Sequence, residues 1–296
     1  MGSLAEDLSN PKSSLDEFSD LCIRVLQHIP NVISERVDVR DGYVINVSDI
    51  AGQKKFVRPI NTNLFLDNPD DFNDAFTELN SLLEGVKNGN RNFSEADHLL
   101  VNRTLYTIQQ SIGAGLDLVL NPNSARKHVG NRFEELLRTT INHLGIAHKK
   151  ITFKIPYESE EGKKLYRCET DLIISPYPKV KSTTNKLAKN EVVLSFKTTS
   201  KDRMGKIFLD KMLMERFSGH QVKVAGIFLN DVQRKGKDNV SYTLVSGLFM
   251  VYTKFLTRLD GVYFLDPPPN TYLNPFKNHI FPFSEFVIND VWELLN

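Results

Sequence analysis

A lysine ends a strand that is otherwise suited to a protein interior. In VVLSFKTTSKDR, residues 192–203, the first residues are strong β-formers. Strand alternation then places Ser195 and Lys197 on one face and Phe196 on the other, toward the core. The strand expected before it, within YRCETDLIIS, carries Asp171 beside an apolar run. A carboxylate there is costly to bury unless a cation meets it, so we expect Asp171 and Lys197 to converge at the sheet. With a divalent metal, such a pair can activate water for phosphodiester attack.

This arrangement resembles the PD-(D/E)XK nucleases, which place one acid at the end of a strand and acid-x-lysine on the next. Asp171 takes the first position and Lys197 the last, and the spacing between them fits a hairpin with a long loop. Two positions depart from the pattern. Thr170 replaces the usual proline, and Ser195 stands where the second metal-binding carboxylate is expected.

The departure at Ser195 is itself typical of one branch. SFKTTSKDR looks like the S-x-K-T-T-x-K/R-D/E-R stretch of type II restriction endonucleases that read CC…GG sites, including CCWGG and CCNGG. In that branch an acid on the following helix replaces the strand carboxylate. The matching residue here, thirteen after Lys197, is Asp210, with Glu215 as its competitor. Arg203, Asp210 and Phe217 recur every seven residues and share a helix face, which favours Asp210.

A second resemblance lies upstream, in RKHVGNRFEELL. It is similar to the G-x-x-F-E helix of the same enzymes, whose glutamate flanks the metal site and corresponds to Glu134. Taken alone, Glu134 and Glu135 would be read as a solvated helix face. The ordered set with Asp171 and Lys197 favours a role in the site.

The triplet Lys201-Asp202-Arg203 occupies the position that reads G·C pairs in the related enzymes. A basic side chain can donate to guanine O6 and N7, and a carboxylate can accept from cytosine N4. By resemblance, Asp202 would read cytosines, whereas Lys201 and Arg203 would read guanines. Basic residues at a helix start are electrostatically unfavourable, so a purely structural role is less attractive.

The resemblance implies a type II restriction endonuclease that makes Mg²⁺-dependent double-strand cuts in a palindromic CC…GG site. Asp171 and Asp210 would hold the metal, and Lys197 would orient and help deprotonate the attacking water. Glu134 would complete the metal shell or order the water, and Ser195 would be an outer hydrogen-bonding residue.

Double-stranded DNA is the implied partner, together with a second copy in a homodimer and a cognate DNA methyltransferase in the same host. Pairing of dimers into tetramers stays open. The alternatives are a structure-specific repair or recombination nuclease of the same fold and a non-catalytic DNA-binding protein.

These residues call for an α/β fold. We expect a restriction-endonuclease-like core with a mixed central sheet flanked by helices over 121–296, and a mostly helical N-terminal α+β subdomain with DNA contacts over 1–120. Arg58, Asn61 and Tyr106 could supply such contacts, but the sequence selects none of them. Periodicity predicts helices over 13–29, 69–86, 94–119, 124–144, 204–217 and 246–258, and one at the C-terminus. Strands are predicted over 32–39, 43–48, 149–155, 164–175, 191–198, 222–229, 240–244 and 261–265.

Composition is consistent with a globular α/β protein. The 296 residues are 41% hydrophobic and 25% charged with net charge +1, which is ordinary for a globular protein. Two cysteines make neither a disulfide framework nor a zinc site, so a reducing compartment is expected. We see no signal peptide and no apolar run long enough to span a bilayer, and therefore expect a cytoplasmic protein with no membrane partner.

Overall fold

The structure is a computed structural model and describes residues 3–50, 52–201, 203–244 and 246–296. Its α-helices are α1 (Leu4–Ser9), α2 (Leu15–His28), α3 (Pro69–Lys87), α4 (Glu95–Val119), α5 (Pro122–His143), α6 (Met204–Ser218), α7 (Ser246–Phe255), α8 (Phe283–Glu285) and α9 (Val291–Leu295). Its strands are β1 (Glu35–Asp38), β2 (Tyr43–Ile50), β3 (Gln53–Phe56), β4 (Ile60–Asn61), β5 (Ala147–Lys149), β6 (Thr152–Ser159), β7 (Gly162–Glu169), β8 (Leu172–Ser175), β9 (Val192–Thr199), β10 (Lys223–Asn230), β11 (Val232–Lys235), β12 (Asn239–Tyr242), β13 (Gly261–Phe264) and β14 (Phe281–Pro282).

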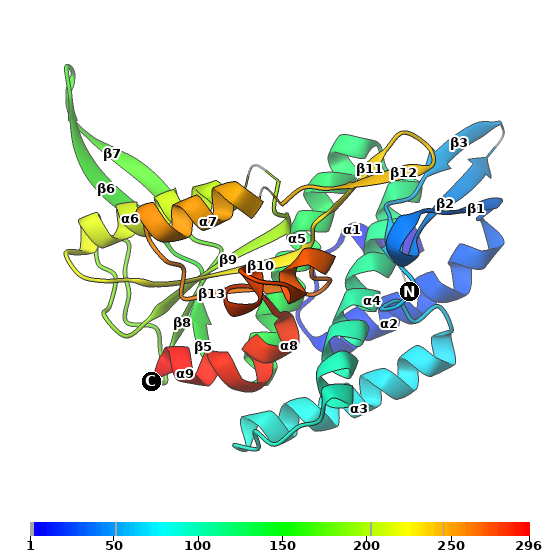
Figure 1. Cartoon of the computed structure of the whole chain (residues 1–296), viewed down its shortest axis with the longest axis horizontal. Coiled ribbons are helices and arrows are strands. Elements are labelled where there is room, and N and C mark those ends of the chain that lie inside the picture. Colours follow the sequence, from blue (N-terminus) through cyan, green and yellow to red (C-terminus); the bar gives the residue numbers. More distant parts are fainter. Residues whose placement is uncertain (1–2, 51, 202, 245) are drawn as a thin grey trace.

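Helix α4 is the central element of the N-terminal half, and α1, α2, α3 and α5 pack against it (Figure 1). Ser94 caps α4 through a capping box with Asp97, as the sequence predicted. Helix α5 begins at Pro122, two residues before the predicted start at 124, and the Asn121 side chain caps it by accepting from the Ser124 amide. Gly145 closes this helical segment with a φ of +74°, a conformation that favours glycine.

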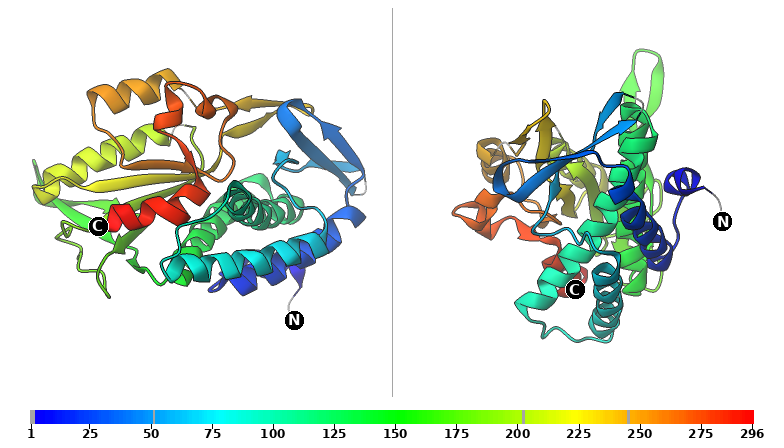
Figure 2. Two further views of the ribbon diagram at one scale, coloured as in Figure 1. Left: turned by 60° about the horizontal axis from the view of Figure 1, so that its bottom comes forward. Right: turned by 90° about the vertical axis from the view of Figure 1, so that its right-hand side faces the viewer.

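The central sheet is mixed, with the strand order β14-β13-β10-β9-β8-β5. Strands β9, β10, β13 and β14 run parallel to one another, whereas β8 is antiparallel to both of its neighbours, β9 and β5. Figure 2 shows this sheet on one side of the molecule and the small β1–β4 sheet on the other. The expected α/β class with a mixed sheet and covering helices is therefore confirmed.

Alternate residues of the sheet enter two different cores. Leu194 and Phe196 of β9 lie in the core shared with α4 and α5, whereas Val193 lies in the core beneath α6 and α7. Helices therefore cover both faces. Side chains that alternate with Phe196 point toward the α6 face.

Two antiparallel ribbons leave the body of the molecule. Strands β6 and β7 form a hairpin that projects beyond α6 (Figure 1), and β11 and β12 form a shorter one beside the β1–β4 sheet. The single strands expected over 149–155 and 164–175 are each divided. The second breaks at Thr170, whose amide and hydroxyl both donate to the Ile151 carbonyl, at 3.0 and 2.8 Å.

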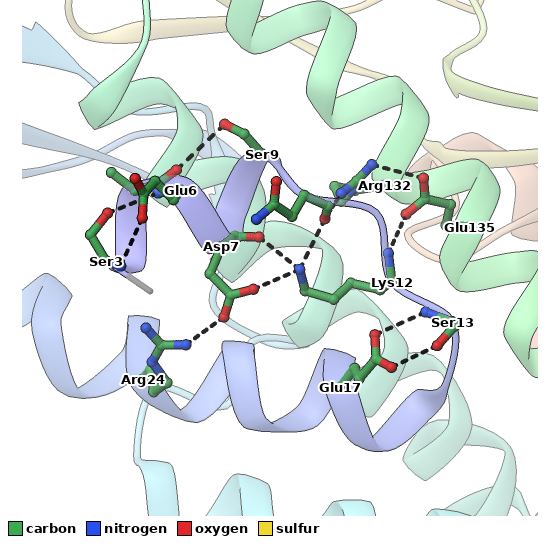
Figure 3. A network of polar contacts seen from close by, with 12 residues as sticks. Ser3, Glu6, Asp7, Ser9, Lys12, Ser13, Glu17, Arg24, Arg132 and Glu135 are labelled. Carbon is green, nitrogen blue, oxygen red and sulfur yellow. Dashed lines mark hydrogen bonds and ion pairs between the residues drawn. The ribbon is translucent and has the colours of Figure 1, made fainter. Parts of the chain in front are cut away.

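A polar network anchors the N-terminal segment to α5 (Figure 3). The buried Lys12 ammonium donates to the carbonyls of Asp7 and Asn10 at 2.7 and 2.9 Å and pairs with the Asp7 carboxylate at 2.8 Å. Glu135 accepts from the Lys12 amide at 2.9 Å and from Arg132 at 2.7 Å. This network ties the N-terminal segment to α5, the helix that carries Glu134.

In the part of the chain that the structure describes, no helix combines the length and the apolar character needed to cross a bilayer. Helix α4 is long, but it buries polar side chains, among them Asn102, Gln109 and Gln110.

Candidate active site and DNA-facing surface

Asp171 and Lys197 meet at the junction of β8 and β9. The Asp171 Oδ2 atom accepts three hydrogen bonds, from Lys197 Nζ at 2.5 Å, the Phe196 amide at 2.8 Å and Ser195 Oγ at 3.1 Å. Lys197 Nζ also donates to the Phe196 carbonyl at 2.9 Å. Each side chain of the Asp171–Lys197 pair keeps 17% of its surface exposed. The pair is therefore held rigidly while both groups stay within reach of a ligand.

Sheet register explains this convergence. Leu172 pairs with Leu194 in the antiparallel β8–β9 ladder, which sets Asp171 opposite Ser195 and on the same face. Phe196 is 3% exposed and points into the opposite core, as alternation predicted. These side chains lie on the face of the sheet that α6 covers. An acidic side chain on α6 can therefore approach them.

Asp210 lies on the side of α6 that faces the β6–β7 hairpin. Burial raises the pKa of the Cys168 thiol, and the nearby Asp210 charge adds to this rise. Cys168 precedes Asp171 by three residues, at the base of the hairpin. Phe217, two turns further along α6, packs on Phe153 of the same hairpin with ring centroids 5.9 Å apart. The structure thus directs Asp210 toward the strand that leads into Asp171, although its carboxylate is paired with Lys206.

The competing acid, Glu215, lies near the other end of α6. Its Oε1 atom accepts from the Val222 amide at 3.4 Å, in the turn that leads into β10. Lys223 of β10 pairs with Val192 at the start of β9, whereas Lys197 lies toward its end. Glu215 therefore has a local role remote from the Asp171–Lys197 pair.

Glu134 approaches from a different direction, because α5 covers the opposite face of the sheet from α6. Its Oε2 atom pairs with Lys150 at 3.2 Å. Lys150 immediately precedes Ile151, the residue that binds Thr170 next to Asp171. Glu134 consequently lies at the border of the sheet near Asp171, and its partner in the structure is a lysine.

Each of the three candidate carboxylates is thus neutralised by a lysine: Asp171 by Lys197, Asp210 by Lys206 and Glu134 by Lys150. Lys150 and Lys206 are more than half exposed, so they can move away at small cost. Burial works to lower the pKa of Lys206, but the Asp210 carboxylate outweighs it and the pKa is raised.

The donor set suits a hard cation. The hydrogen bonds recorded for Asp171 all use Oδ2, which leaves Oδ1 for a ligand, and carboxylate oxygens are what Mg²⁺ prefers. No three His, Cys, Asp or Glu side chains among the described residues are already gathered as a metal-binding group. A bound cation would therefore draw in Asp210 or Glu134 by displacing its lysine.

Lys201 and Arg203, two of the three residues expected to read bases, lie immediately before α6. Lys201 is exposed, and its Nζ atom donates to Gln233 Oε1 of β11 at 3.4 Å. Arg203 is exposed at the N-terminal cap of α6, where its side chain makes no capping bond. Asp202 lies outside the described residues.

A buried aspartate that the sequence reading missed fixes this turn. Asp231, fully buried after β10, accepts from Ser200, from Thr243 Oγ1 at 2.6 Å and from the Leu244 amide at 2.7 Å. Burial raises the pKa of Asp231 above its ordinary value in spite of these donors. The position of Asp231 directly after an apolar strand was the one available signal.

The N-terminal candidates for DNA contact are used inside the protein. Arg58 makes a two-pronged ion pair with Asp117 at 2.9 Å. Asn61 donates to the buried Asp266 at 2.9 Å, and the fully buried Tyr106 hydroxyl accepts from the Asn61 amide at 2.8 Å. All three side chains are therefore engaged in contacts within the protein.

Comparison with solved structures identifies the fold. The chain superposes on the crystal structure of the Type IIP restriction endonuclease Kpn2I with a TM-score of 0.71 and 17% identity, covering 95% of this chain and 91% of that one. The complex of restriction endonuclease PspGI with its substrate DNA matches at a TM-score of 0.41 and 14% identity, covering 77% of this chain and 92% of that one. No protein-family model matches the sequence, and no curated protein matches it significantly. The chain therefore shares the fold of a Type IIP restriction endonuclease structure.

Proposed function

We propose that the protein is a type II site-specific deoxyribonuclease that cuts both strands of a palindromic site containing CC…GG, with Mg²⁺ as cofactor. The observation that carries the proposal is the Asp171–Lys197 pair, held by the Phe196 amide and Ser195 on the α6 face. An overall fold shared with a restriction endonuclease along nearly the whole chain supports it.

The residues of the pair divide the chemistry between them. Lys197, as an ammonium, would donate to the scissile phosphate, stabilise the charge that develops there and help the attacking water lose its proton by stabilising the hydroxide that results. Ser195 and the Phe196 amide hold the Asp171 carboxylate while one of its oxygens stays open. Asp171 and Asp210 would hold Mg²⁺, with Glu134 completing the set at the border of the sheet. Bound there, the metal would lower the pKa of a water and polarise the phosphate.

The remaining assignments follow from the same site. Lys201, Asp202 and Arg203 would read G·C pairs, and cleavage of both strands of a palindrome implies a two-fold homodimer, with further DNA contacts from the N-terminal region over 1–120. The two cysteines are free and buried, which suits a cytoplasmic protein, and a cognate methyltransferase would protect the host DNA.

Digestion of plasmid DNA followed by sequencing of the ends tests the proposal. In Mg²⁺ we expect discrete fragments whose ends define one CC…GG site. Random or junction-specific nicks would instead identify a structure-specific nuclease, and sequence-selective binding without cleavage would identify a DNA-binding protein.

A further inference from the structure

The β11–β12 ribbon has one packed face and one open face. Register pairs Val232 with Tyr242 and Arg234 with Val240, so these four side chains share a face. That face is anchored: Val232 and Val240 are buried against Tyr43 and Ile45 of the small N-terminal sheet. The Arg234 guanidinium lies 5.0 Å from the centre of the Phe56 ring. The ribbon is therefore fixed in place by its apolar side.

The opposite face is polar. It carries the pairs Gln233–Ser241 and Lys235–Asn239. Lys235 and Asn239 are exposed, and Gln233 and Ser241 are half-buried. Of the charged residues between 232 and 244, Arg234 belongs to the packed face, Lys235 to the open face, and Lys237 and Asp238 to the turn between the two strands. This open face thus combines hydrogen-bonding amides with positive charge, a composition that suits an anionic partner with polar edges.

This polar face continues the candidate base-reading turn. Gln233 accepts from Lys201 Nζ, and Asp231 at the root of the ribbon binds Ser200 at the root of the turn. The same carboxylate binds Thr243 and Leu244, where the ribbon ends. One buried group therefore joins the ribbon and the turn into one continuous surface.

We infer that the polar face of the β11–β12 ribbon enters the DNA major groove beside the Lys201 turn and reads the base pairs adjoining those that this turn contacts. This inference rests on the proposed function. The major groove is wide enough for a two-stranded ribbon, and Gln and Asn can each make two hydrogen bonds to adenine. Gln233, the residue nearest Lys201, thereby specifies an adenine next to the G·C pairs. Lys235 donates to guanine or phosphate further out, and Lys237 at the tip contacts phosphate.

Selection of bound sequences from a randomised duplex pool in Ca²⁺, with parallel cleavage in Mg²⁺, tests the inference. Gln233→Ala should relax the preference at one A·T position by roughly 5- to 100-fold and leave the other positions unchanged. Gln233→Glu should shift that position toward cytosine, since a carboxylate accepts from its N4 group. Lys237→Ala should weaken binding to all sequences alike. It should also reduce the slope of the logarithm of the binding constant against the logarithm of salt concentration by about one.

Lys189→Ala is the matched control, because Lys189 is an equally exposed lysine before the start of β9, at the far end of that strand from Lys201. Thermal unfolding would verify that each variant is folded. Wild-type cleavage combined with the same base preference in Gln233→Ala, Gln233→Glu and Lys189→Ala would overturn the ribbon inference alone. Selective binding that depends on Gln233 without any wild-type cleavage would sink the proposed function and support the ribbon. Binding without any base preference would overturn both.

Discussion

Replacing Ser195 and Lys197 separately distinguishes a supporting residue from a catalytic one. Ser195→Ala removes one of the three donors to Asp171 Oδ2, the longest at 3.1 Å. A hydrogen bond to a charged group contributes about 1.5–3 kcal/mol. Since the Asp171 side chain is 17% exposed, the loss should lie near the lower end, about 1.5 kcal/mol, or roughly tenfold in rate.

Lys197→Ala removes a charge that would face the phosphate, and a loss of about 100- to 1,000-fold is expected for such a group. Single-turnover cleavage in Mg²⁺ measures both variants, and DNA binding in Ca²⁺ with thermal unfolding verifies that they remain intact. This division of roles is wrong if the cleavage rate of Ser195→Ala falls as far as that of Lys197→Ala. It is also wrong if Lys197→Ala keeps more than a tenth of the wild-type cleavage rate.

Three further predictions concern buried groups. Asp231→Asn should reduce stability by about 1–3 kcal/mol, because its hydrogen-bonding partners lose a charged acceptor, and should raise cleavage of near-cognate sites. Burial raises the pKa of Asp266 to about 6 from 3.8. As the pH is raised, the folded state therefore retains this proton to a higher pH than the unfolded chain does. Stability should therefore fall by about 3 kcal/mol as pH rises from about 4 to 6, and Asp266→Asn should remove that slope in denaturant titrations. Gly113→Ala would bring a Cβ within 2.4 Å of the Arg58 guanidinium carbon, and the overpacking should cost about 1–3 kcal/mol, visible as a lower melting temperature.

Each of these has an outcome that contradicts it. Unchanged site selectivity in Asp231→Asn would show that the β9–α6 turn does not depend on this carboxylate. An identical pH slope in wild type and Asp266→Asn would place the titration on another group. An unaltered melting temperature in Gly113→Ala would mean that Arg58 can leave Asp117 without cost.

The convergence of Asp171 with Lys197 could be predicted because it needs only strand alternation, the pairing of two strands adjacent in the sheet, and the cost of burying a carboxylate without a cation. Once β8 and β9 pair in register, Asp171 must lie opposite Ser195, and no distant segment is needed. The long helices were equally accessible, since α2, α3 and α4 show regular apolar spacing and carry caps near their starts.

The ribbons were harder to predict, because their residues have little local pattern. Most of β6 and β7 is exposed on both faces, so alternation gives a weak signal there. The strand β11 was missed altogether. Its sequence is polar, and the partners of Val232 are Tyr43 and Ile45, almost two hundred residues away.

The distant partners of the buried carboxylates could not be predicted either, because they too lie far away in the sequence. Asp266 accepts from the Tyr43 hydroxyl at 2.7 Å across a separation of 223 residues, and no sequence spacing indicates such a pair. The lysine partners of Asp210 and Glu134 were likewise not foreseen, although Lys206 lies one helical turn before Asp210.

Asp171→Asn gives the most direct test of the central claim, because it keeps the size of the side chain while removing its charge. The decisive measurement is single-turnover cleavage of plasmid DNA in Mg²⁺ by wild type and Asp171→Asn, with binding to the same DNA in Ca²⁺ as the reference. We predict discrete double-strand cuts by the wild type, and binding without detectable cleavage by the variant. Cleavage by Asp171→Asn within tenfold of the wild-type rate would contradict the account.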